Sequence, residues 1–212
     1  MKNRRALIVL LSVYILSIGL CGITDAGAQE RKVLLIAREG SVAPGEMVDQ
    51  ELTVMKDLME KSGLTVVIST STGRELLSAS RSIKPNYKLS EIDPSEYQGV
   101  IIACMAAGRP GQIPLEALKI VKFIFSKGLP VAAQDGAVCI LADAGILKGK
   151  KYALYKQIFY IRDGIYSGRG VVVDGNLITS GACPYVAIVH AESPDCTTML
   201  TEKFIEMVKN VK

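Results

Sequence analysis

The side chains best suited to chemistry in this sequence are five cysteines and a single histidine. Cys104 ends one apolar segment, Cys183 follows another, and Cys139 lies between them. A thiolate is a nucleophile, and two neighbouring thiols can form a disulfide. No C-x-x-C pair is present, and no other residue stands at metal-ligand spacing from His190. We therefore expect no zinc finger, no metal site and no bound cofactor.

The cysteines leave several interpretations open. Cys104, Cys139 and Cys183 could approach one pocket and supply a nucleophile or a disulfide near it. Cys104 and Cys139 could equally be small buried core residues, which is common for cysteine. Cys196 precedes the last predicted helix and is interpreted as a surface or structural residue. Tyr185, close behind Cys183, could line the pocket or simply pack.

Composition limits the class of protein. The chain has 212 residues, of which 49% are hydrophobic and 22% charged, and its formal net charge is +4. These values predict one globular domain rather than a disordered chain. The charge is too small and too dispersed for a nucleic-acid surface. Neither a G-x-x-x-x-G-K-[ST] nor a G-x-G-x-x-G motif occurs.

The first residues read as a targeting segment. A basic start, Met1–Arg5, precedes the apolar run Ala6–Leu20 and the A-x-A sequence Ala26-Gly27-Ala28. We predict a cleavable signal peptide over 1–28 and a periplasmic or secreted single domain over 29–212. An uncleaved membrane anchor and a lipoprotein signal at Cys21 are the alternatives, and the former is the only membrane association that we expect.

Segments of strand and helix character alternate along the rest of the chain. Apolar runs bounded by polar residues predict strands, and apolar residues at helical spacing predict helices. The Asp174-Gly175-Asn176 sequence predicts a hairpin. This order favours an α/β fold with a mostly parallel sheet, whose ligands bind at the carboxyl ends of the strands. The predicted strands are 32–37, 65–69, 99–104, 129–133, 151–154, 158–162, 170–173 and 177–180, with a short helix and hairpin within 73–93, and the predicted helices are 44–62, 114–127, one ending near 145, and 197–211.

Four segments resemble the ThiJ/PfpI family of the class I glutamine-amidotransferase-like superfamily, and the resemblance extends over 32–209. They are KVLLIA with the helix that ends at Lys61-Ser62-Gly63, LSEIDPSEY before GVIIA, LPVAA before LADAGILKG, and VVVDGNLITS. The resemblance implies a flavodoxin-like three-layer sandwich with a mostly parallel central sheet. It also implies a homo-oligomer.

Members of this family carry a reactive cysteine on a tight turn between a strand and a helix, a glutamate that meets it, and a glycine pair near it. Counting back from Ala144-Gly145 places the cysteine position at Asp135, and the histidine that often follows it at Gly136. Counting back from Gly63 places the glutamate at Glu51. The glycine pair falls within 104–108, where no Gly-Gly occurs.

The resemblance therefore brings Glu51 and Asp135 together in a pocket without the family's nucleophile. Two carboxylates in one pocket cannot both ionise at low cost, so we expect a raised pKa for one of them. We predict an exported, stress-related pseudoenzyme that binds a small metabolite or a partner without thiol-dependent catalysis. The alternatives are a hydrolase or lyase with Glu51 and Asp135 as acid and base, a thiol-based redox or stress-response protein, and an Asp135 that only caps a helix. The other predicted pocket residues are Gly136, Cys104, Met105, Ala106, Cys139, Cys183 and Tyr185.

Overall fold

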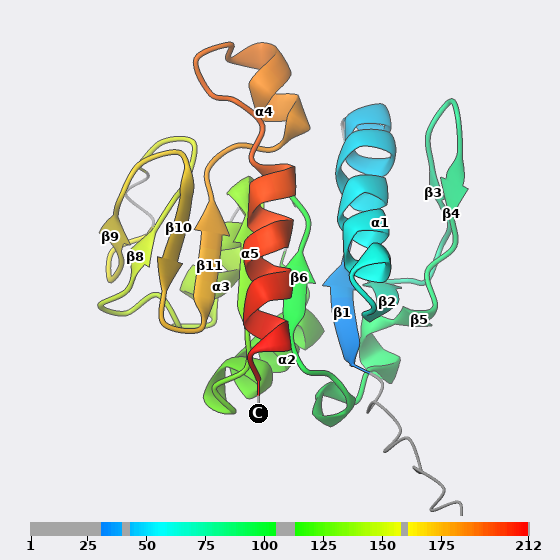
Figure 1. The fold of residues 1–212 in the computed structure, drawn as a ribbon, viewed down its shortest axis with the longest axis horizontal. Helices are drawn as coiled ribbons and strands as arrows, with labels where there is room; N and C mark the ends of the chain where they lie inside the picture. Colours follow the sequence, from blue (N-terminus) through cyan, green and yellow to red (C-terminus); the bar gives the residue numbers. More distant parts are fainter. Residues whose placement is uncertain (1–30, 40–42, 105–112, 158–160, 212) are drawn as a thin grey trace, which may run out of the picture.

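A seven-stranded sheet forms the centre of the molecule (Figure 1). The computed structural model describes residues 31–39, 43–104, 113–157 and 161–211, so the predicted signal peptide lies outside the described residues. In spatial order the strands are β10 (Val171–Asp174), β11 (Leu177–Ser180), β7 (Val131–Gln134), β6 (Val100–Ile102), β1 (Lys32–Ile36), β2 (Thr65–Thr70) and β5 (Tyr87–Lys88).

The sheet is parallel except at one edge, where β10 pairs antiparallel with β11 through the predicted hairpin. The strands β2, β1, β6, β7 and β11 lie side by side in that order, which is the 2-1-3-4-5 order of flavodoxin-like sheets. The connections change direction between β1 and β6. In such sheets, ligands bind at that point, beyond the carboxyl ends of the strands.

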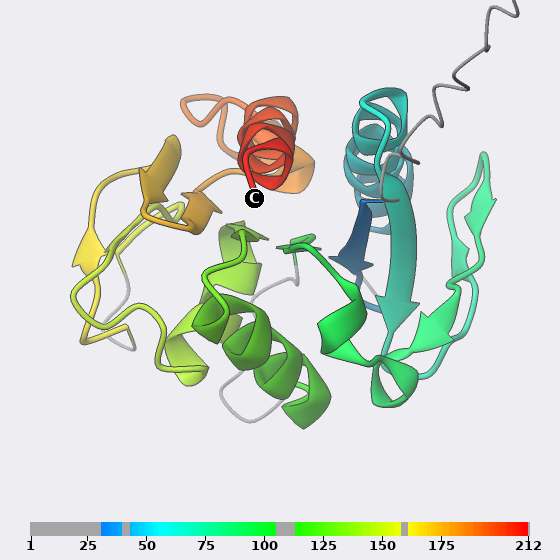
Figure 2. The ribbon, with the colours of Figure 1, turned by 60° about the horizontal axis from the view of Figure 1, so that its bottom comes forward.

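Helices cover both faces of the sheet, as Figure 2 shows. The predicted three-layer α/β sandwich is confirmed. On one face lie α1 (Thr53–Lys61) and α5 (Thr197–Lys209), and on the other lie α2 (Leu115–Ser126) and α3 (Val138–Asp143).

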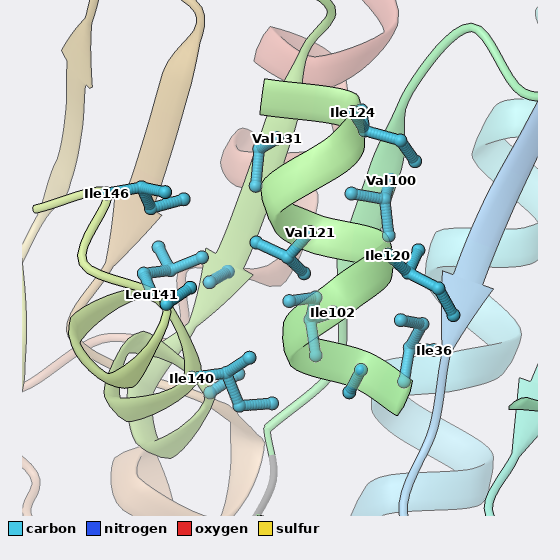
Figure 3. Close-up of a cluster of buried hydrophobic side chains, with 14 of the residues drawn as sticks. Ile36, Val100, Ile102, Ile120, Val121, Ile124, Val131, Ile140, Leu141 and Ile146 are labelled. Carbon is cyan, nitrogen blue, oxygen red and sulfur yellow. The ribbon is translucent and has the colours of Figure 1, made fainter. Parts of the chain in front are cut away.

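The central strand β1 shows why the sheet needs two helical layers. Its residues Val33 and Leu35 pack in the cluster beneath α1 and α5, whereas Leu34 and Ile36 pack in the cluster beneath α2 and α3. Successive side chains of a strand point to opposite faces, so an apolar run such as this one is buried only between two layers. Figure 3 shows the second cluster, in which Ile36 lies among the isoleucines and valines of α2 and β6.

The helix predicted over 44–62 has two parts. Its first part, η1 (Glu46–Leu52), is π-helical, and α1 continues from it. At the junction, the N–H of Thr53 donates to the carbonyl oxygen of Val48, five residues earlier, and the Thr53 hydroxyl donates to the same oxygen at 2.7 Å. Periodicity alone does not distinguish this wider turn from an α-helix.

The segment 73–93 contains the predicted hairpin and the predicted short helix. Within 73–93, β3 (Leu76–Leu77) and β4 (Ser82–Ile83) form the hairpin, and the short helix is the 3-10 turn η2 (Leu89–Glu91). A further 3-10 turn, η3 (Pro94–Glu96), follows it.

Residues 158–160 of the strand predicted at 158–162 lie outside the described residues. The described part of that range, Ile161 and Arg162, lies outside any strand, and β8 (Lys151–Tyr152) pairs instead with β9 (Ile165–Tyr166). The Tyr152 and Tyr166 rings meet edge to face with their centroids 5.8 Å apart. This contact favours the pairing of β8 with the later segment Ile165–Tyr166.

The last two helices follow the hairpin strand β11. The sequence predicted α5, but it did not predict α4 (Pro184–Val189), which begins directly after Cys183. In the part of the chain that the structure describes, no helix has both the length and the apolar character needed to cross a membrane.

Candidate functional site

The candidate site lies at the edge of the sheet where β1, β6 and β11 end near α4 (Figure 1). Cys104 stands two residues beyond β6, Asp135 directly follows β7, and Cys183 stands three residues beyond β11. Glu51 comes from η1, which contacts α4. Parallel strands thus bring to one place four residues that lie far apart in the sequence.

Asp135 occupies a strained turn between β7 and α3. Its φ is 42°, and among the described residues it is the only one other than glycine with a positive φ. The turn continues as η4 (Asp135–Ala137), a 3-10 segment that runs into α3. A residue with a side chain adopts this conformation at a cost, and such positions cluster at functional sites.

The interpretation of Asp135 as a mere helix cap is corrected. The residue before η4 is Gln134 and the residue before α3 is Ala137, and no side-chain hydrogen bond caps either helix. The Asp135 carboxylate instead accepts hydrogen bonds from the backbone of Gly136 and Tyr155 and from the Cys104 thiol, whose sulfur lies 3.6 Å from Oδ2. Burial outweighs these bonds and raises the pKa of Asp135.

Glu51 is a buried acid, with 2% of its surface exposed. Its Oε1 accepts the N–H of Cys104 at 2.5 Å, which fixes the chain where it leaves β6. Burial raises the pKa of Glu51 well above its usual range, and the nearby groups of Cys183 and Asp135 act in the same direction. The expected raised carboxyl pKa therefore occurs at Glu51 as well as at Asp135.

Two thiols complete the site. The ligand atoms of Cys104, Asp135 and Cys183 all lie within 4.8 Å of one another. A hydrogen bond to Cys183, together with burial, raises the pKa of Cys104 well above its usual value. That hydrogen bond, aided by the backbone N–H groups of Val186 and Tyr185, lowers the pKa of Cys183 against the effect of burial.

Two contacts fix the path of the chain to Cys183. Gln134, at the end of β7, donates through Nε2 to the carbonyl oxygen of Ala182 at 3.1 Å and to Thr197 Oγ1 at 2.7 Å. Gly181 passes so close to Arg169 and Leu154 that a Cβ on it would lie 2.6 Å from their backbone atoms. The residues next to the site thus fix the end of β7, the chain that follows β11 and the start of α5 relative to one another.

The remaining predicted pocket residues have different positions. Gly136 is buried beside Asp135. Cys139 is buried in α3 outside the cluster of Cys104, Asp135 and Cys183, and burial raises its pKa to about 11. Tyr185 leaves 42% of its surface exposed on α4. Met105 and Ala106 lie outside the described residues.

Sequence reasoning missed Tyr155 and found no partner for His190. The two rings stack with centroids 4.3 Å apart, and the Tyr155 backbone also contacts the Asp135 carboxylate. His190 immediately follows α4. Nothing in the spacing of the sequence links 155 to 135, because the contact depends on the path of the chain after β8, where Tyr155 lies.

Comparisons with known proteins agree with this architecture. An uncharacterized protein of Methanocaldococcus jannaschii is 31% identical over 171 residues, which are 76% of this chain and 80% of that protein. A protein of Pyrococcus horikoshii named as a deglycase is 29% identical over 143 residues, which are 64% of this chain and 84% of that protein. The crystal structure of a ThiJ/PfpI domain protein from Brachyspira murdochii superposes with a TM-score of 0.67 at 17% identity, covering 86% of this chain and 99% of that one.

The family model described as the DJ-1/PfpI family matches residues 32–188, which include Glu51, Cys104, Asp135 and Cys183. The match extends from the first residue of β1 into α4, so it includes every strand that contributes to the site. The chain therefore belongs to the DJ-1/PfpI family.

Proposed function

We propose that this protein binds a small polar molecule at the pocket of Glu51 and Asp135. The turn after β7 carries Asp135 where the family carries its cysteine, so the proposed binding uses a carboxylate there and no thiol. One observation carries the proposal: the strained turn with φ 42° presents a carboxylate, and the groups around that carboxylate are polar. A carboxyl group held in this way accepts hydrogen bonds from hydroxyl or amino groups of a ligand. It lacks the soft nucleophilicity of a thiolate.

The relatives suggest the class of ligand. Several of them, at about 28–31% identity, are named deglycases. Deglycases act on adducts between small carbonyl compounds and amines, which carry hydroxyl and amino donors. We propose small carbonyl compounds and these adducts as the ligands, because the carboxyl groups of Glu51 and Asp135 match such donors.

The experiment measures binding and turnover of methylglyoxal and of its adduct with an amino acid. Asp135→Asn is compared with Asp143→Asn, which changes an exposed acid near the end of α3. We expect the wild type and Asp143→Asn to bind the adduct alike. Asp135→Asn should bind it at least about tenfold more weakly, which is the size of effect expected when a charge-assisted hydrogen bond is lost.

Each outcome bears on the mechanism. Binding without turnover supports a binding protein. Turnover that is lost in both Asp135→Asn and Glu51→Gln supports instead a hydrolase or lyase that uses these residues as acid and base. Equal binding by the wild type and Asp135→Asn contradicts the proposal.

A thiol-based redox function is the second candidate, because Cys104 and Cys183 hold their sulfur atoms within 4.8 Å. Hydrogen peroxide would oxidise both thiols to one disulfide and be reduced to two molecules of water, with the two thiol protons passing to the water. Counting free thiols after peroxide treatment tests this function. Loss of two thiols in the wild type, but not in Cys183→Ser, supports it; four unchanged thiols in residues 29–212 exclude it.

Export and self-association are proposals that rest on the sequence. N-terminal sequencing of the protein isolated from its cells should begin at Gln29 if the signal peptide is cleaved after Ala28. A start at Met1 would contradict this. Light scattering of the purified protein tests for the homo-oligomer, and a mass of one chain would contradict it.

A further inference from the structure

We propose that Cys104, Asp135 and Cys183 form a zinc site, with two sulfur ligands, one carboxylate ligand and a fourth position open to water or a ligand. The inference goes beyond the proposed function and also departs from our expectation that the chain has no metal ligands. That expectation rested on spacing in the sequence. The three side chains come from segments after three different strands, β6, β7 and β11.

The distances suit a tetrahedral zinc ion. Zinc bonds of about 2.3 Å to sulfur and about 2.0–2.2 Å to a carboxylate oxygen place the two ligand atoms about 3.5 Å apart. Cys104 Sγ and Asp135 Oδ2 are 3.6 Å apart. Two sulfur ligands of one zinc lie about 3.8 Å apart by the same geometry. Since all ligand atoms already lie within 4.8 Å of one another, the Cys183 sulfur has to come closer by at most about 1 Å to the Cys104 sulfur and about 1.3 Å to the Asp135 oxygen.

The types of ligand select the ion. Thiolates are soft ligands that zinc accepts together with a carboxylate, whereas magnesium and calcium bind oxygen ligands. When zinc binds, the protons of the two thiols are released to solvent, and two thiolates and a carboxylate then place three negative charges in a space that is largely closed to solvent. A divalent cation offsets two of these charges, and charge of this kind is costly to bury without compensation.

The surroundings resemble the outer contacts of a metal site. The backbone N–H groups of Val186 and Tyr185 lie close enough to the Cys183 sulfur to lower its pKa, and that of Gly136 acts in the same direction on the pKa of the Asp135 carboxylate. Such donors orient ligands and are a regular feature around protein-bound metals. Glu51 is not a member of the cluster, but its bond to the Cys104 backbone makes it a positioning residue.

Access to the ion comes from one side. Cys183 is 1% exposed, whereas Cys104 and Asp135 are half-buried. A zinc ion here would therefore have its open position on the side of Cys104 and Asp135. Sites with three protein ligands and one open position are the catalytic type rather than the structural type.

The experiment uses zinc alone as the probe. Untagged protein is reduced, freed of metal with EDTA and dialysed against micromolar zinc chloride, and its zinc content is measured. We expect one zinc per chain. Cys104→Ser and Cys183→Ser should each weaken binding by at least about tenfold, whereas the matched control Cys139→Ser, at a buried cysteine outside the cluster, should bind as the wild type does.

Two further readouts do not depend on the variants being folded. Cobalt in place of zinc should give the wild type thiolate-to-cobalt charge-transfer bands. Zinc should slow the alkylation of Cys104 and Cys183 but not of Cys196, whose thiol contacts the carbonyl oxygens of Arg169 and Pro194.

Reduced wild type that binds no zinc overturns the inference, and so does equal binding by the cysteine variants and the control. Binding of the carbonyl adduct is measured separately, in EDTA. Failure of the zinc site is thereby distinguished from failure of the proposed function.

Discussion

At the scale of single residues, Glu51 joins the end of β6 to η1 through one hydrogen bond from the Cys104 backbone. Glu51→Leu removes the acceptor and leaves a buried N–H without a partner, which should cost about 1–3 kcal/mol of unfolding free energy. Glu51→Gln keeps an oxygen acceptor of the same shape and should cost less than about 1 kcal/mol. Urea unfolding of the two variants measures the difference. Equal losses in both would show that this hydrogen bond does not stabilise the fold.

Cys139 gives a prediction for pH dependence. Burial raises its pKa to about 11, so little thiolate exists at pH 8. Alkylation by iodoacetamide at pH 8 should be about two orders of magnitude slower than for a small thiol with a pKa of about 8.5, because the thiolate is the reactive form. As pH rises towards 11 the rate should keep increasing. Mass spectrometry of the peptide that contains Cys139 follows the reaction, and a rate that levels off near pH 9 would contradict the raised pKa.

The sequence located the acids better than it located the thiols. Asp135 and Glu51 were found by counting from Gly145 and Gly63, because helix lengths fix those distances. Cys104 and Cys183 were recognised as residues at strand ends, but their mutual distance depends on strand order in space. The prediction therefore placed Cys104 and Cys183 in the same pocket as Asp135, but only the fold shows that their ligand atoms and that of Asp135 lie within 4.8 Å of one another.

At the scale of elements, Gly181 fixes how β11 leads into α4. A Cβ at this position would lie 2.6 Å from the backbone of Arg169 and Leu154, and neither can move without shifting its strand or turn. Gly181→Ala should therefore lower the free energy of unfolding by about 1–3 kcal/mol, as overpacking does.

Gly170→Ala is the matched control, since no atom lies within 4 Å of a Cβ there. Thermal and urea unfolding should show a change smaller than about 0.5 kcal/mol for this variant. If the two variants are equally stable, the close approach at Gly181 does not constrain the chain before Cys183.

The sequence was a good guide to strands and a poor guide to short elements. β1, β2, β6, β7 and β11 were predicted because each is an apolar run that two helical layers bury. β9 and α4 were missed. Each is short, and tertiary contacts such as the one between Tyr152 and Tyr166 determine its place.

At the scale of the whole molecule, α5 joins the two halves of the sheet. It packs against α1, β7 and β11, and its Phe204 is fully buried in the cluster beneath α1 and α5. Phe204→Ala should lower the free energy of unfolding by about 3–5 kcal/mol, because it leaves a cavity where the ring packs against Gly99.

The matched control on the same helix is Met199→Ala, at a side chain that is 56% exposed. This variant should change the free energy of unfolding by less than about 0.5 kcal/mol. Urea unfolding followed by circular dichroism compares the two. A small loss in Phe204→Ala would mean that α5 contributes little to the stability of the sheet.

The π-helical turn η1 also determines the angular phase of the helix that follows β1. A π turn holds more residues than an α turn, so it behaves as a one-residue insertion in an otherwise regular helix. Deleting one residue between 46 and 50 would let the segment return to α geometry, and each residue of register is about 100° of rotation. The acid at position 51 would then point away from the end of β6.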